Sequence, residues 1–174
     1  MNARTPSSML LPVETVMSAK DPGPVQPEDE ELHNFKLLSG MGQLRVDQLF
    51  YMADKLQLAQ KQKEAIELYQ EWLANTNDER IDLALFNYGS LLQSQGFTSQ
   101  AEAAYRTCIE RNPELLQASI NLGLILERFG KNDEALETWS HVVAKGYLQK
   151  STDKSLQVMA LNHIGRVYEK LKKY

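Results

Sequence analysis

Residues 82–147 contain the same sequence pattern twice, and this repetition constrains the fold more than any other feature. Gly89 and Gly123 lie 34 residues apart, and similar residues recur at the same offsets around them. The first copy has, in order, Leu85, Tyr88, Gly89, Leu92, Gly96, Ala101, Tyr105, Cys108 and Pro113. The second copy has Ser119, Leu122, Gly123, Leu126, Gly130, Ala135, Trp139, Val142 and Tyr147. A period of this length indicates a supersecondary unit whose copies stack to bury a continuous core.

The spacing within each copy predicts a hairpin of two helices. Gly89 in the first helix and Ala101 in the second are small, so the two helices can approach closely while larger residues fill the space around them. Gly96 falls after the first helix, where a residue in the left-handed conformation commonly ends a helix. Pro113 is expected to open the next helix, since its missing N–H costs nothing in the first turn.

These residues resemble the tetratricopeptide-repeat family, which has a small residue after a large apolar one in the first helix and an alanine followed by an aromatic in the second. The resemblance implies an all-α fold of antiparallel helix-turn-helix repeats stacked into a right-handed superhelical solenoid. We place the repeat domain at 46–174, with repeats at about 46–79, 82–115 and 116–149 and a half-repeat at 158–174. The first repeat is degenerate, because Gln60 stands where later copies have the turn glycine. Atypical terminal repeats are common in such folds.

The segments at the two ends are expected to differ from the repeats. Residues 1–27 are rich in proline and polar residues, and we predict a disordered leader there. Residues 28–45 are predicted to form a short capping helix and a turn, because an acidic cluster precedes a weak apolar stripe. The half-repeat has a broad apolar stripe and lacks the second helix that the pattern requires. A terminal cap should be polar, so the stripe favours a longer protein.

Composition excludes several functions. A formal net charge of -4 and a pI of about 5.4 argue against general nucleic-acid binding. No run of 18 apolar residues is present, so no membrane span is predicted, and we expect a cytoplasmic location. His33, His141 and His163 have no metal-ligand spacing with each other or with Cys108, which we expect to be a small buried residue. We therefore predict no catalytic residue, metal or cofactor in this chain, and no enzyme activity.

Residues that flank the small position of each first helix are the candidates for binding a partner, because the first helices of stacked pairs line a concave groove. Asn87 and Asn121 precede that position by two, and an asparagine amide can pair with the backbone of an extended peptide. His163 takes the same offset in the half-repeat and Tyr51 in the first repeat. The other candidates are Phe86, Ser90, Ile120, Leu124, Glu127, Arg128 and Arg166. The alternative is that each asparagine bonds only to neighbouring backbone.

The two asparagines and the runs 101–106 and 126–130 are similar to the N-terminal repeats of bacterial SPINDLY-like O-GlcNAc transferases, in a resemblance that covers 46–174. It implies a peptide-binding arm in which an asparagine ladder holds the acceptor polypeptide. The catalytic domain of that family would follow Tyr174, so no UDP-sugar residue is assigned. A carboxylate clamp for heat-shock chaperones is disfavoured, because Phe86 and Ile120 stand where a clamp lysine is expected.

The favoured hypothesis is a non-catalytic protein–protein interaction module that binds an extended peptide or a partner helix in its groove. The alternative is the substrate-recognition arm of a SPINDLY-like glycosyltransferase whose catalytic domain lies outside this chain. A third hypothesis is a scaffold that self-associates through the C-terminal half-repeat. Arg128, Arg166 and Lys170 are also a candidate basic patch for an acidic segment, although a solvated helix face is the favoured interpretation. The expected partner is a protein or peptide, with no nucleic acid and no membrane.

Overall fold

The computed structural model describes residues 27–148 and 154–172, and this part of the chain is entirely α-helical apart from turns. The eight helices are α1 (Pro27–Gly40), α2 (Val46–Leu58), α3 (Gln62–Asn75), α4 (Ile81–Ser94), α5 (Thr98–Arg111), α6 (Leu116–Arg128), α7 (Asn132–Leu148) and α8 (Lys154–Leu171). The predicted all-α class is therefore confirmed. The predicted leader lies outside the described residues apart from its last residue, as does part of the segment between the third repeat and the half-repeat.

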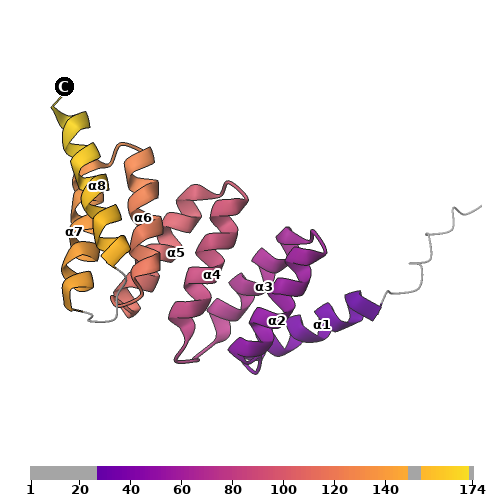
Figure 1. Cartoon of the computed structure of the whole chain (residues 1–174). Helices are drawn as coiled ribbons and strands as arrows, with labels where there is room; N and C mark the ends of the chain where they lie inside the picture. Colours follow the sequence, from indigo (N-terminus) through magenta and orange to yellow (C-terminus); the bar gives the residue numbers. More distant parts are fainter. Residues whose placement is uncertain (1–26, 149–153, 173–174) are drawn as a thin grey trace, which may run out of the picture.

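The helices follow one another along an elongated solenoid (Figure 1). Three antiparallel pairs, α2–α3, α4–α5 and α6–α7, are stacked in chain order, and α8 packs on α7 at the end. Helix α1 packs on α3 and α2 at the other end, where Lys36 pairs with Glu67 across 2.9 Å. From α2 onward each helix contacts mainly its neighbours along the chain, as expected of a repeat architecture, whereas α1 packs mainly on α3.

The small residues of the first helices lie directly against aromatic rings of the second helices. A Cβ atom added to Gly89 would lie 2.8 Å from the Tyr105 ring, and one added to Gly123 would lie 2.7 Å from the Trp139 ring. Both aromatic side chains are fully buried. The predicted close approach of the two helices is therefore built from a glycine facing an aromatic ring in each of these pairs.

The turns between paired helices use the left-handed backbone conformation in all three repeats. Gly96 has φ +81 and Gly130 has φ +69, as the sequence predicts. Gln60, at the equivalent place in the first pair, keeps the same geometry with φ 61, although side chains other than glycine seldom adopt it. The prediction for Pro113 is wrong: this residue lies in the turn before α6, which begins only at Leu116.

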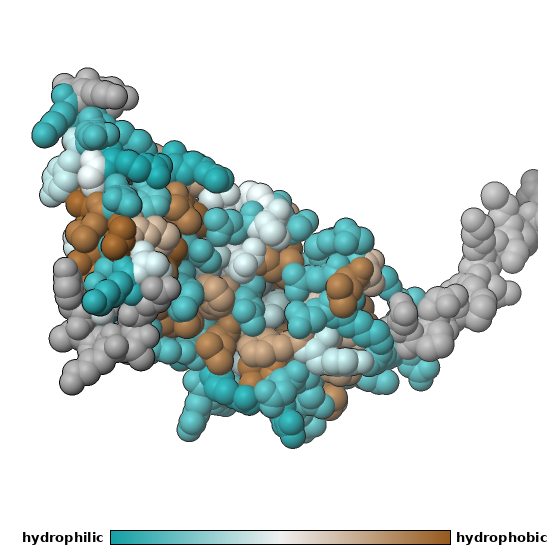
Figure 2. Space-filling view, viewed as in Figure 1, coloured by the Kyte–Doolittle hydropathy of each residue, from teal (hydrophilic) through white to brown (hydrophobic). Residues whose placement is uncertain are grey.

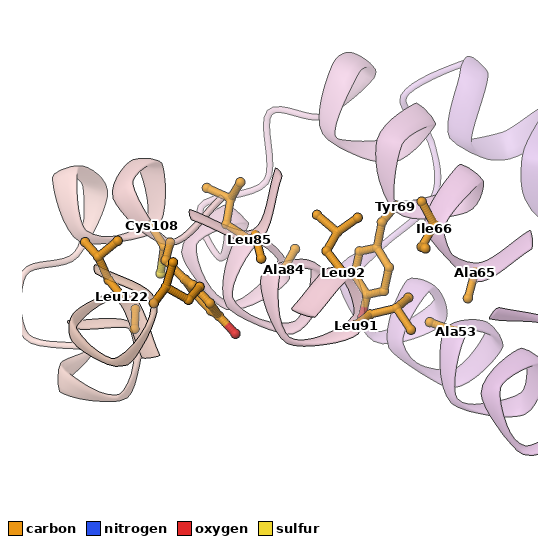
Figure 3. Packing of buried hydrophobic residues seen from close by; sticks show 14 of the residues in the cluster. Ala53, Ala65, Ile66, Tyr69, Ala84, Leu85, Leu91, Leu92, Cys108 and Leu122 are labelled. Carbon is orange, nitrogen blue, oxygen red and sulfur yellow. The ribbon is translucent and has the colours of Figure 1, made fainter. Parts of the chain in front are cut away.

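The core runs along the solenoid where successive pairs meet. Tyr69 of α3 lies among Ile66, Leu91 and Leu92, so it joins the first pair to the second (Figure 3). Cys108 is buried further along, and its Sγ lies 3.2 Å from the backbone oxygen of Asp82. Burial raises the pKa of the Cys108 thiol to about 11, with the nearby Asp82 acting in the same direction. Cys108 is thus a buried, protonated core residue, as expected.

Among the first helices of the repeats in the described part of the chain, only α8 has no second helix against the face that carries its small residue. A Cβ atom added to Gly165, the counterpart of Gly89 and Gly123, would meet nothing within 4 Å. Val158, Leu161, Tyr168 and Leu171 are exposed large apolar residues of this helix. The space-filling view shows hydrophobic residues gathered at this end of the molecule (Figure 2).

Candidate protein-binding groove

The position two residues before each small residue lies against the aromatic residue of the preceding helix pair. Asn87 lies in one pocket with Tyr69, where its side chain acts to lower the pKa of the tyrosine, and the Asn121 Nδ2 donates to the Tyr105 hydroxyl across 3.0 Å. His163, in the same position of α8, stacks on Trp139 with ring centroids 4.3 Å apart. Neither asparagine is limited to bonding its neighbouring backbone, which was the alternative considered from the sequence.

The tyrosines hold the asparagines in fixed orientations. Burial raises the pKa of Tyr69 and of Tyr105, although Asn87 and Asn121 act in the opposite direction. Both hydroxyls are therefore neutral at physiological pH, and that of Tyr105 donates in turn to the Gln93 Oε1 across 3.0 Å. Because one N–H of the Asn121 amide is used in this way, its other N–H and its Oδ1 are left for a ligand.

Two pockets lie along the first helices and define what we call the first-helix groove. The first, about 410 Å³, lies where α2, α3 and α4 meet. Its lining residues are Asp54, Gln57, Tyr69, Asn87, Ser90, Leu91 and Ser94. The second, about 270 Å³, spans α4, α6 and α8. Its lining residues are Gln93, Leu124, Ile125, Glu127, Arg128, Arg166 and Lys170.

Glu127 is the centre of the second pocket. Its side chain is only 4% exposed, and its Oε2 lies 2.7 Å from the His163 Nδ1. Its Oε1 is shared by Arg166 at 3.0 Å and Lys170 at 3.3 Å. Burial acts to raise the pKa of Glu127, but the hydrogen bonds from His163 and Lys170 and the charge of Arg166 together hold it below its ordinary value. Glu127 is therefore an ionised carboxylate that ties α8 to α6.

The structure places the predicted groove residues in three settings. Asn87 and Ser90 line the first pocket, and Leu124, Glu127, Arg128 and Arg166 line the second. Asn121 and His163 lie at the groove but are engaged with aromatic residues. Phe86 and Ile120 line neither pocket, since they are half-buried against the core, with Phe86 packed on the Tyr105 ring.

Tyr69, Gln93 and Asp54 were not among the groove residues expected from the sequence, although all three line the groove pockets. Lys170 was expected only in the candidate basic patch with Arg128 and Arg166, and it lines the second pocket with both of them. Tyr69 carried no signal of a groove position, since the repeat pattern assigns it only a core role.

A further pocket of about 310 Å³ lies between α5, α6 and α7. It contains a serine–histidine contact, with the Ser119 Oγ 3.3 Å from the His141 Nδ1. Ser119 is almost fully buried, and this contact joins α6 to α7. Within residues 27–148 and 154–172, no group of three or more histidine, cysteine or acidic side chains is placed to hold a metal ion. No helix in the same ranges has both the length and the apolar character to cross a membrane.

The fold and the groove together define a helix-pair solenoid, an architecture whose extended concave surfaces serve as scaffolds for protein–protein contacts. Comparison with known families gives a match to the description "Tetratricopeptide repeat" over residues 83–115, which is the α4–α5 pair. The central helix pair is therefore a tetratricopeptide repeat, which supports that family for the chain. Curated protein sequences gave no match.

Several solved structures share the fold. The TPR2B domain of yeast Sti1, in a complex with pHsp70, has a TM-score of 0.58 and 14% identity over 71% of this chain and 96% of that one. PcrH from Pseudomonas aeruginosa has a TM-score of 0.57 and 20% identity over 70% of this chain and 90% of that one. MamA has a TM-score of 0.52 and 18% identity over 85% of this chain and 96% of that one. At these identities the likeness establishes the fold alone.

Proposed function

We propose that this chain is a non-catalytic interaction module that binds an extended peptide or a partner helix in the first-helix groove. The observation that carries the proposal is the repeated asparagine–tyrosine contact, which presents two amides in fixed orientations from successive repeats. An amide whose orientation is fixed in advance loses little conformational freedom when a peptide backbone pairs with it. The Sti1 domain, which shares this fold, is described in complex with pHsp70, so such a solenoid does bind a protein-derived ligand.

Replacing both Asn87 and Asn121 with alanine should weaken peptide binding about tenfold or more, because two hydrogen bonds to the ligand are lost. A peptide selected from a random display library against the wild-type chain supplies the probe, and fluorescence anisotropy gives the affinity. Thermal unfolding should change little, since the Tyr105 hydroxyl keeps its bond to Gln93.

The matched control replaces Asn34 and Asn77 with alanine, because both are exposed and line neither groove pocket. This control should bind the peptide as the wild type does. Unchanged affinity in the Asn87/Asn121 variant would remove the asparagines from the mechanism.

We further propose that two copies pair through α8. The face that the other repeats cover with a second helix is open here, and Gly165 at its centre would let two α8 helices approach closely. A two-fold pairing uses the same face on both copies, so the exposed apolar face of one α8 can cover that of the other. Sedimentation velocity at high protein concentration should show a dimer. Leu161→Glu should abolish it, and Leu58→Glu, an exposed leucine on α2, should not. A wild-type chain that sediments as a monomer throughout contradicts this proposal.

The glycosyltransferase alternative rests on the sequence resemblance. It requires a catalytic domain outside this chain, and in that case the groove proposed here would hold the acceptor polypeptide. UDP-sugar turnover by a longer gene product is the measurement that would support it.

A further inference from the structure

Three cationic side chains converge in the second pocket of the groove. Arg166 and Lys170 lie one helical turn apart on α8, and both contact the same oxygen of Glu127. Arg128, the residue after Glu127, lines the same pocket from α6. No hydrogen bond or ion pair joins Arg128 to any other side chain in the described ranges 27–148 and 154–172, so its guanidinium is free to bind a ligand.

The pocket carries an excess of positive charge that the rest of the molecule does not share. Arg128, Arg166 and Lys170 face one carboxylate, Glu127, which leaves a formal charge of +2 in a chain whose net charge is -4. The side chains of Arg166 and Lys170 are 60% and 48% exposed, so their ion pairs with Glu127 leave donor atoms available. Glu127 itself is buried beneath them and fixes their positions.

The remaining lining residues determine the class of ligand. Gln93 accepts a hydrogen bond from Tyr105 through its Oε1, so its amide N–H groups can donate to an acceptor in the pocket. Leu124 is exposed at the rim and offers an apolar contact. Donors and cations around a small space suit a carboxylate, since guanidinium groups pair with carboxylates through two parallel hydrogen bonds. The exposed leucine suits an apolar neighbour of that carboxylate.

The other pocket of the groove has the opposite character. Asp54 is its only charged lining residue, among polar groups that include Asn87 and Ser90. A peptide lying along the groove would therefore meet an anionic side chain at α2 and a cationic cluster at α8. Charge complementarity of this kind fixes the direction in which a ligand binds more than it adds to affinity.

We propose that the pocket formed by Arg128, Arg166 and Lys170 binds the carboxylate of an aspartate or glutamate in the peptide ligand, with an apolar neighbour of that residue on Leu124. The inference rests on the proposed function, because it names the ligand chemistry of one part of the same groove. It makes the ligand an acidic peptide whose acidic residue lies at the α8 end.

The test uses the full chain and a capped Glu-Leu-Glu tripeptide, followed by the NMR signals of the arginine Nε–H groups. The tripeptide is about 10 Å long when extended, so it occupies this pocket without depending on the rest of the groove. The Arg128 and Arg166 signals should shift to saturation, and the dissociation constant should rise as salt screens the charges. A capped Gln-Leu-Gln tripeptide of the same shape should cause no saturable shift.

Two charge reversals provide the matched comparison. Arg128→Glu should weaken tripeptide binding about tenfold or more, because it replaces a cation of the pocket by an anion. Arg111→Glu changes the net charge equally at an exposed residue at the end of α5, and it should alter binding less than about twofold. Lys170→Gln, which removes a charge without reversing it, should give an intermediate loss with α8 still folded by circular dichroism.

Three outcomes would overturn the proposal: equal shifts with the glutamine tripeptide, equal losses in Arg128→Glu and Arg111→Glu, or no saturable shift with Glu-Leu-Glu. The first would show that no carboxylate is recognised, and the second that only overall charge matters. Failure of the Asn87/Asn121 test would leave this result standing, because the tripeptide does not need the asparagines. The two proposals can therefore fail separately.

Discussion

Gly123→Leu is expected to destabilise the chain by about 1–3 kcal/mol or more, measured as the free energy of unfolding in urea. Even the first added atom would lie 2.7 Å from the Trp139 ring, and that ring is fully buried and cannot move aside. The added side chain must therefore separate α6 from α7. Because Trp139 also stacks on His163, the loss should extend to the docking of α8.

The matched control is the same substitution at Gly165, where an added Cβ meets nothing within 4 Å. Leucine has a higher helix propensity than glycine, so Gly165→Leu should leave stability unchanged or raise it by up to about 1 kcal/mol. Measurement at low protein concentration keeps any pairing through α8 out of the comparison. Equal destabilisation by the two variants would contradict the assignment of Gly123 as the contact point of its helix pair.

Glu127→Gln should lower the free energy of unfolding at neutral pH by about 1–3 kcal/mol, since the charge-assisted bonds to His163, Arg166 and Lys170 are weakened. The folded-state pKa of Glu127 lies below its ordinary value of 4.5. A depressed carboxylate pKa contributes stability that is fully present above the unfolded-state pKa and is lost as the pH falls through the folded-state pKa. The cost of the substitution should therefore shrink as the pH is lowered below about 4.

Urea unfolding of both proteins at neutral pH and at about pH 3 measures this difference. Glu137→Gln is the matched control, because Glu137 is an exposed carboxylate in α7 with no ion pair to another described side chain. Its substitution should cost little at either pH. A cost for Glu127→Gln that is the same at both pH values would mean that Glu127 acts through packing and not through its charge.

Several elements of the fold were predictable because each depends on neighbours in the sequence. The period of 34 residues, the glycines at 96 and 130 and the small residues at 89 and 123 follow from the geometry of a helical hairpin. All contacts of a helical hairpin lie within one repeat, so the residue types that it requires recur at fixed sequence offsets. The turn at Gln60 shows the limit of this prediction. The turns of the second and third repeats have a glycine in the left-handed conformation, whereas the first repeat has a glutamine in the same conformation.

The groove was less predictable, because its contacts join residues of different repeats. The offset of Asn87 and Asn121 was readable from the repeat pattern, but their contacts with Tyr69 and Tyr105 depend on how one pair stacks on the preceding one. The contact of Glu127 with Lys170 spans 43 residues and lies between two side chains with several rotatable bonds. No fixed offset encodes such a contact.

The sequence by itself therefore determined the helix pairs, their period and the small residues that let them pack, since these depend on helical geometry within one repeat. Only the tertiary structure decided that Arg128, Arg166 and Lys170 share one pocket above a buried glutamate, and that α8 keeps an open face. The physical reason is that stacking sets the rotation and offset between repeats. That rotation and offset decide which long polar side chains of separate helices meet.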